Sequence, residues 1–138
     1  MTEYLLDTNA IIWFLDGSNR LDSRIREDIE YFQHQYWYSY ASILEMIHLQ
    51  QRGKVRLDYS AEQIFERLNS CYMHPILATT DIFTTLNTIP ILKIDGAEHS
   101  DMFDRYIIAS AIARRLTLIS ADQKFPDYRK FGLKLIEL

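Results

Sequence analysis

The 138-residue sequence is poor in the residues that mark linkers, disulfide frameworks and membrane spans. Its one cysteine, Cys71, excludes a disulfide framework within the chain and a zinc site built from several cysteines, and it suits a reducing compartment. Four glycines and three prolines are too few for long flexible linkers. No apolar run approaches the roughly 18 residues of a membrane-spanning helix, and the N-terminal residues lack the basic start of a secretory signal. We therefore expect a single domain over residues 1–138, located in the cytoplasm and not attached to a membrane.

Positive charge is also scarce, because 15 Lys and Arg residues stand against 19 Asp and Glu residues, which gives a formal net charge of −4. This balance argues against a protein that binds nucleic acid by overall electrostatic attraction. Two short segments are nevertheless basic, one at Arg52, Lys54 and Arg56 and one over residues 124–134. An acidic protein with basic edges can still bind a polyanion if metal ions neutralise its acidic centre.

Short apolar segments alternate with segments of helical periodicity along the whole chain. The patterns predict strands at residues 3–7, 36–40, 73–78, 117–120 and 134–138, and helices at residues 10–15, 23–32, 42–51, 60–72, 80–88 and 103–116. Such alternation is typical of an α/β domain with a mostly parallel sheet and helices on both faces. In these folds the ligand site lies outside the carboxyl ends of the strands.

Four carboxylates occur at strand ends and helix starts, where such a site is expected. Asp7 closes the first strand, Glu45 is the single charged residue of residues 41–47, Asp104 opens the apolar helix 103–116, and Asp122 follows strand 117–120. Each also has a purely structural explanation. Asp7 could cap a helix, and Glu45 has capping-box spacing from Ser42. Asp104 could face the helix dipole, and Asp122 could be a turn residue.

Asp104 is the most difficult of the four to explain structurally. Ile107, Ile108 and Ala111 follow it at helical spacing, so its carboxylate belongs to the apolar stripe of the helix. A carboxylate that points inward is costly unless it is paired or bound to a metal. No Lys or Arg is an obvious shared partner for all four acids, and hard divalent cations prefer oxygen ligands. Together the four acids predict a Mg²⁺ or Mn²⁺ site.

The segments that carry these acids resemble those of a known family. They are residues 5–13, residues 42–46 with Gly53 and Lys54 after them, residues 99–111, and residues 118–125. In this order and spacing the chain resembles the PIN domain family, and within it the VapC-type toxin ribonucleases of toxin–antitoxin pairs. Met102 stands where many relatives carry proline.

The resemblance implies a PIN-like three-layer α/β/α fold with a mostly parallel sheet of about five strands. It also implies metal-dependent cleavage of RNA, with the metal held by Asp7, Asp104 and Asp122 and with Glu45 completing the cage or acting as a base. Thr8, Asn9 and Ser120 are expected to orient these carboxylates by hydrogen bonds. Asp101 could share the metal-binding role, but the resemblance and the apolar stripe both favour Asp104.

Five basic residues are candidates for contacts with RNA phosphates, namely Arg52, Lys54, Arg56, Arg105 and Lys124. We assign His48, His74 and His99 structural roles. The resemblance implies an antitoxin that binds across the acidic face and inserts an Arg or Lys toward the carboxylates. Apolar side chains in residues 25–32 and 64–72 exceed what one core needs, which predicts a homodimer.

Other functions remain open at this stage. The first is a PIN nuclease of RNA processing that is not a toxin. The second is a phosphatase of the haloacid-dehalogenase type, which needs a second acid two residues after Asp7, where this chain has Asn9. The third is a receiver-like module that binds phosphate without catalysis. It needs an acidic pair beside the first strand, and Asp7 stands alone.

Overall fold

The computed structural model describes residues 2–138 and contains six α-helices, a short 3₁₀ helix and seven strands in that range. In chain order these are β1 (Glu3–Leu6), α1 (Thr8–Asp16), α2 (Ser23–Glu30), β2 (Gln35–Ser39), α3 (Tyr40–Gln51), α4 (Ala61–Ser70), β3 (His74–Ile76), α5 (Thr80–Thr88), β4 (Leu92–Ile94), β5 (Ala97–His99), α6 (Met102–Arg114), β6 (Thr117–Ser120), η1 (Phe125–Phe131) and β7 (Lys134–Glu137). None of these helices has the length and apolar character that crossing a membrane requires.

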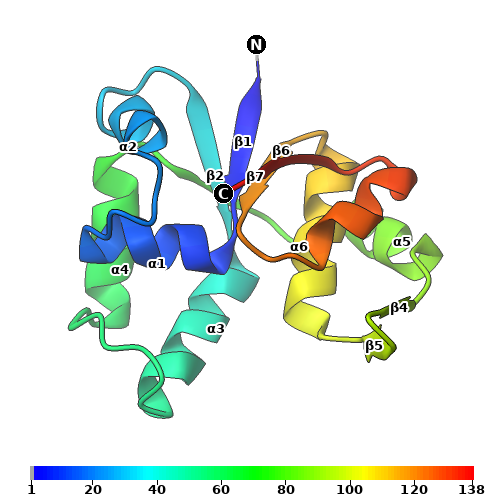
Figure 1. The fold of residues 1–138 in the computed structure, drawn as a ribbon. Helices are drawn as coiled ribbons and strands as arrows, with labels where there is room; N and C mark the ends of the chain where they lie inside the picture. The colour runs from blue at the N-terminus through cyan, green and yellow to red at the C-terminus, as the bar shows by residue number, and fades with distance from the viewer. Residues whose placement is uncertain (1) are drawn as a thin grey trace.

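The main sheet has five parallel strands in the order β3-β2-β1-β6-β7, with β1 at its centre. Figure 1 shows α1, α2 and α4 on one side of this sheet and α5 and α6 on the other. Leu5 and Leu6 of β1 point to opposite faces, so Leu6 joins the core under α1 and Leu5 joins the core under α6. The predicted three-layer α/β/α fold with a five-stranded parallel sheet is confirmed.

The sequence patterns missed two elements, the antiparallel hairpin β4–β5 and the helix η1. Each strand of the hairpin has only three residues, too few for a period of two to be visible. Asp95 and Gly96 connect the strands, and both have positive φ angles, 53° and 83°. Two positive φ angles in an Asp-Gly pair are typical of a tight type I′ hairpin turn.

The apolar residues of α2 and α4 are mostly core residues rather than surplus surface. Ile29 of α2 and Ile64 and Leu68 of α4 are fully buried in the core. The exposed aromatic side chains of the two segments lie just beyond the C-terminal ends of the helices, at Tyr31, Phe32 and Tyr72. The sequence-based expectation of a large apolar surplus is therefore wrong for the helix interiors. A homodimer stays a prediction that the fold of one chain does not test.

Candidate metal centre

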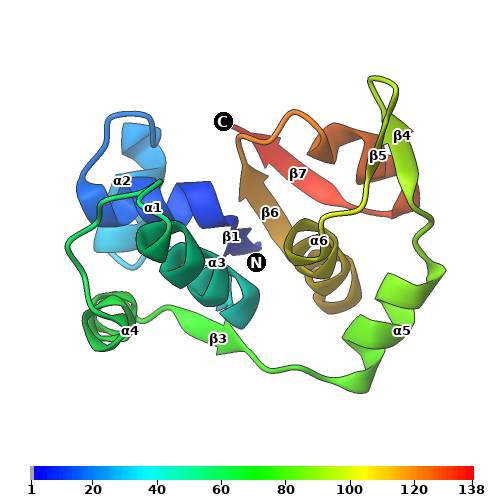
Figure 2. The same ribbon diagram turned by 90° about the horizontal axis from the view of Figure 1, so that it is seen from below.

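The four predicted acids come from four different elements that meet at the carboxyl edge of the sheet. Asp7 directly follows β1, and Asp122 follows β6, the parallel neighbour of β1. Glu45 lies on α3 and Asp104 in the first turn of α6. Helices α3 and α6 contact each other and lie side by side in Figure 2. The acids are close enough for their charges to act on one another, as the pKa shifts below indicate.

Asp7 is the most deeply buried of the four, with 4% of its surface exposed. Its Oδ2 atom accepts a hydrogen bond of 2.8 Å from the Ser120 hydroxyl. It occupies the N-cap position of α1, but its side chain makes no capping hydrogen bond, so capping does not explain a carboxylate here. Burial raises the pKa of Asp7 to about 7; the hydrogen bond from Ser120 opposes this shift, and the charges of Asp104 and Glu45 add to it.

Glu45 lies in the interior of α3, whose N-cap is Ser39, so the capping-box explanation with Ser42 is excluded. Its Oε1 atom is buried and has no hydrogen-bond partner among the described residues. Burial raises the pKa of Glu45, a contact with the Thr8 hydroxyl opposes the shift, and the charge of Asp104 adds to it. The same Thr8 hydroxyl donates to Ser42 Oγ at 3.0 Å. An unpartnered buried carboxylate oxygen is costly unless something else binds it.

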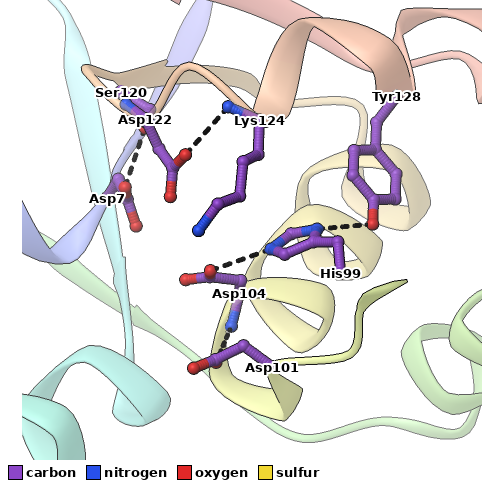
Figure 3. A network of polar contacts seen from close by, with 8 residues as sticks. All are labelled: Asp7, His99, Asp101, Asp104, Ser120, Asp122, Lys124 and Tyr128. Atoms are coloured by element: carbon purple, nitrogen blue, oxygen red, sulfur yellow. Dashed lines mark hydrogen bonds and ion pairs between the residues drawn. The ribbon is translucent and has the colours of Figure 1, made fainter. Parts of the chain in front are cut away.

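Asp104 is partly buried and lies at 3.0 Å from His99, measured from Asp104 Oδ2 to His99 Nε2. Burial raises the pKa of Asp104, the hydrogen bond with His99 opposes the shift, and the charges of Asp101 and Asp122 add to it. His99 Nδ1 in turn lies 2.6 Å from the Tyr128 hydroxyl, and Figure 3 shows the three side chains in a row. The sequence predicts only a structural role for His99 and does not reveal this contact with Asp104. The signal available was its position five residues before Asp104, in the segment that carries the resemblance.

Asp101 and Asp122 both take part in local backbone hydrogen bonds. Asp101 is the N-cap of α6, and its Oδ1 accepts from the Asp104 amide at 3.0 Å. Asp122 Oδ1 accepts from the Lys124 amide at 2.9 Å, as expected of a turn residue. The Ser120 hydroxyl accepts from the Asp122 amide at 3.0 Å, so one hydroxyl joins Asp122 to Asp7.

Among the residues expected to orient the acids, Ser120 and Thr8 are buried and hydrogen-bonded, as described above. Asn9 differs from them. It is exposed on α1, and no side-chain hydrogen bond of Asn9 is found in the described part of the chain. The structure therefore places Ser120 against Asp7 and Thr8 near Glu45, and it leaves Asn9 facing outward.

The PIN domain model matches residues 4–131, which is most of the chain. The chain belongs to the PIN domain family. The family predicted from the sequence is thereby confirmed. PIN domains are typically nucleases and typically use divalent metal ions. No curated protein matches this PIN domain in sequence.

Solved structures that resemble this PIN domain include toxin–antitoxin complexes. The VapBC2 complex from Rickettsia felis, bound to a DNA fragment from its promoter, matches with a TM-score of 0.72 at 13% identity, covering 99% of each chain. A DNA-bound VapBC from Salmonella typhimurium matches with a TM-score of 0.62 at 16% identity, covering 99% of this chain and 98% of the other. FitAcB from Neisseria gonorrhoeae matches with a TM-score of 0.58 at 19% identity, covering 97% and 96%. At these identities the likeness shows the shared fold.

The basic residues predicted to contact RNA fall into two groups in this PIN domain. Arg52, Lys54 and Arg56 are exposed at and beyond the end of α3, and Lys124 is exposed beside the acids. Figure 3 shows the Lys124 side chain extending toward the space between Asp122 and Asp104.

Arg105 does not fit the prediction of a phosphate contact, which is wrong for this residue. Only 8% of its surface is exposed, and its Nη2 atom donates to the carbonyl oxygen of Ile89 at 2.7 Å. A guanidinium group buried against a backbone carbonyl is not available to RNA. Its role is to tie the first turn of α6 to the end of α5.

The four acids of this PIN domain suit a hard divalent cation in the chemistry of their donor atoms. All four offer carboxylate oxygens, and the unpartnered Glu45 Oε1 is a donor without another use. Within residues 2–138, no Lys or Arg forms a salt bridge with any of the four. In that same range no three His, Cys, Asp or Glu side chains are drawn together into a ready-made metal cage. The donor set fits Mg²⁺ or Mn²⁺, and the side chains would have to close around the ion.

Proposed function

We propose that this PIN domain is a Mg²⁺- or Mn²⁺-dependent endoribonuclease that hydrolyses RNA phosphodiester bonds. In this proposal Asp7, Asp104 and Asp122 bind the metal, and Glu45 completes the site. The observation that carries the proposal is that burial and mutual repulsion raise the pKa of Asp7, Glu45 and Asp104 while no Lys or Arg pairs with them in the described chain. Perturbed carboxylates gathered at one edge are typical of a functional site.

The residues have distinct roles in the proposed reaction. A divalent cation supplies Lewis-acid chemistry, because it lowers the pKa of water and offsets charge that develops on the scissile phosphate. Asp7, oriented by the Ser120 hydroxyl, and Asp104, oriented by His99, bind the cation. Glu45 Oε1 is free of hydrogen bonds, so it can take the proton from the attacking water. The Lys124 side chain extends toward the space between Asp122 and Asp104, where its charge would bind the RNA backbone.

The proposal extends to a biological role as the toxin of a toxin–antitoxin pair. The structural neighbours named above are toxin–antitoxin complexes, which supports an antitoxin as partner. We propose that the antitoxin covers the face of Arg52, Lys54 and Arg56 and directs an Arg or Lys toward the four carboxylates. We also propose a homodimer. Phe32 and Tyr72 are exposed and in edge-to-face contact at 4.9 Å, and with the exposed Tyr31 they offer an aromatic patch for such an interface.

The test of the proposed activity uses purified wild type and Asp7→Asn, prepared identically, with single-stranded RNA in Mg²⁺, in Mn²⁺ and in excess chelator. We expect cleavage by the wild type with either metal, and no cleavage in chelator or by the variant. Cleavage that persists in chelator, or equal cleavage by Asp7→Asn, would show a contaminating nuclease or a different site. Arrest of growth on induced expression separates a toxin from a PIN nuclease of RNA processing, which would be tolerated.

A further inference from the structure

His99 is a buried histidine with both ring nitrogens engaged, and it lies at the end of the hairpin that the sequence did not reveal. It is the last residue of β5 and is 4% exposed. Its Nε2 lies 3.0 Å from Asp104 Oδ2, and its Nδ1 lies 2.6 Å from the hydroxyl of Tyr128, which is fully buried. The ring thus connects two segments of the site, because Asp104 lies on α6 and Tyr128 follows the Asp122 turn on η1 (Figure 3).

The direction of the two hydrogen bonds follows from their partners. An ionised carboxylate can only accept, so the His99 nitrogen facing Asp104 must carry the proton and donate. In a neutral ring the other nitrogen then accepts, and the Tyr128 hydroxyl donates to it. The hydrogen bonds therefore run in one direction, from the Tyr128 hydroxyl through the imidazole to Asp104.

The surrounding structure holds the imidazole in place. Leu92 of β4 pairs with His99 across the hairpin, which fixes the backbone that carries the ring. Arg105 donates to the Ile89 carbonyl at 2.7 Å, which ties α6 to the chain just before β4. The ring also lies edge-on to Tyr128, with centroids 5.5 Å apart. A hydrogen-bond donor that is held by these contacts restricts the rotation of the carboxylate to which it donates.

We propose that His99 is a positioning residue for metal binding, which fixes the Asp104 carboxylate through Oδ2 and leaves Oδ1 available to a cation. This inference rests on the proposed function, because it assumes that Asp104 is a metal ligand. Outer partners of metal ligands are typically worth about 10- to 100-fold in metal affinity. A histidine that only fills the core would affect folding and leave metal affinity unchanged.

Three variants separate the two roles. His99→Leu removes both hydrogen bonds, His99→Gln keeps an N–H donor near the position of Nε2, and Tyr128→Phe removes only the distal hydroxyl. We expect Mn²⁺ affinity, measured by calorimetry on the whole chain, to fall about tenfold in His99→Leu and about two- to fivefold in Tyr128→Phe. His99→Gln should recover most of the loss, because the contact with Asp104 is retained.

Thermal melting in chelator establishes that each variant is folded. Asp104→Asn serves as the reference for the loss of the proposed metal ligand itself. A folded His99→Leu that binds Mn²⁺ within twofold of wild type would overturn the inference. If His99→Leu does not fold, unchanged affinity in Tyr128→Phe, or an imidazole nitrogen spectrum of the wild type without a proton on Nε2, would overturn it equally. Failure of the wild type to bind Mn²⁺, or wild-type affinity in Asp104→Asn, would instead overturn the proposed function.

Discussion

The protein contains two clusters of one Asp, one His and one Tyr, at opposite ends of the sheet, and they differ in how the carboxylate is satisfied. The clusters are Asp28 with His34 and Tyr36, and Asp104 with His99 and Tyr128. In the first the carboxylate stands in the middle and accepts from both partners. In the second the histidine stands in the middle, and the carboxylate receives one partner. The same three residue types therefore form two different hydrogen-bond arrangements.

The Asp28 cluster joins α2 to the amino end of β2. Asp28 Oδ2 accepts from the Tyr36 hydroxyl at 2.6 Å, and both carboxylate oxygens lie 2.9 Å from His34 Nδ1. The Tyr4 ring stacks on Tyr36 at 5.2 Å and meets the His34 ring edge-on at 5.6 Å. A carboxylate satisfied in this way stabilises the fold and has little left to offer a ligand.

The Asp104 cluster has the opposite character, because its carboxylate faces other carboxylates. His99 occupies only Oδ2, and the charges of Asp101 and Asp122 help to raise the pKa of Asp104. Such an arrangement is unfavourable by itself and becomes favourable when a cation is bound. The surroundings of a carboxylate, rather than its nearest His and Tyr, therefore decide whether it remains available to a ligand.

Removing the charge of a predicted metal ligand should have the largest effect on RNA cleavage. Asp7→Asn and Asp104→Asn should each lower RNA cleavage more than about 100-fold, since partners one step further from a metal are already worth about 10- to 100-fold. Both variants should remain folded, and Asp7→Asn should be stabilised without metal, because an amide accepts from Ser120 without carrying charge. Initial rates of cleavage and thermal unfolding check the two statements.

Asp28→Asn is the matched control from the other cluster. It should cleave RNA at the wild-type rate and lose about 1–3 kcal/mol of stability, because the charged acceptor of Tyr36 and His34 is removed. Loss of cleavage in a folded Asp28→Asn, with cleavage retained in Asp104→Asn, would reverse the assignment of the two clusters.

The sequence could predict the gathering of the acids because that depends on local patterns and one topological rule. Asp7 and Asp122 follow strands, and parallel strands bring their carboxyl ends to one edge. The environment of His99 could not be predicted in this way. It depends on a hairpin with three-residue strands and on Tyr128, which lies 29 residues away in the chain. Burial of Arg105 depends likewise on one backbone carbonyl 16 residues away, which no periodicity reveals.

A smaller effect is expected on the pH dependence of stability, through the raised pKa of Asp7. Burial raises the pKa of Asp7 from 3.8 to about 7, so between these values the folded chain holds a proton that the unfolded chain has released. The contribution of Asp7 to the free energy of unfolding therefore falls as the pH rises from about 4 to 7, by at most about 4 kcal/mol. The advantage of Asp7→Asn over wild type should be near zero at pH 4 and largest above pH 7.

Urea unfolding of both proteins in chelator, at several pH values, measures this difference. An advantage of Asp7→Asn that stays constant between pH 5 and 8 would contradict the raised pKa. The rate of RNA cleavage should rise with pH over the same range, because a protonated Asp7 cannot bind the cation. Cleavage by the wild type should therefore decline as the pH falls below about 7.

The smallest expected effect concerns Lys124, which lies next to Asp122 at the candidate metal centre. Figure 3 shows its side chain extending toward Asp122 and Asp104, where a positive charge favours RNA phosphate and opposes a metal cation. Lys124→Met should weaken binding of a non-cleavable RNA about two- to fivefold and strengthen Mn²⁺ binding by a similar factor, as expected of an exposed charge.

Lys130→Met is the control, because it removes the same charge from η1, where the ammonium lies over the Phe131 ring at 5.5 Å. It should change neither affinity. RNA anisotropy and Mn²⁺ calorimetry must move in opposite directions for Lys124. If RNA binding alone weakens, Lys124 acts at the rim of the site, and its ammonium does not compete with the cation.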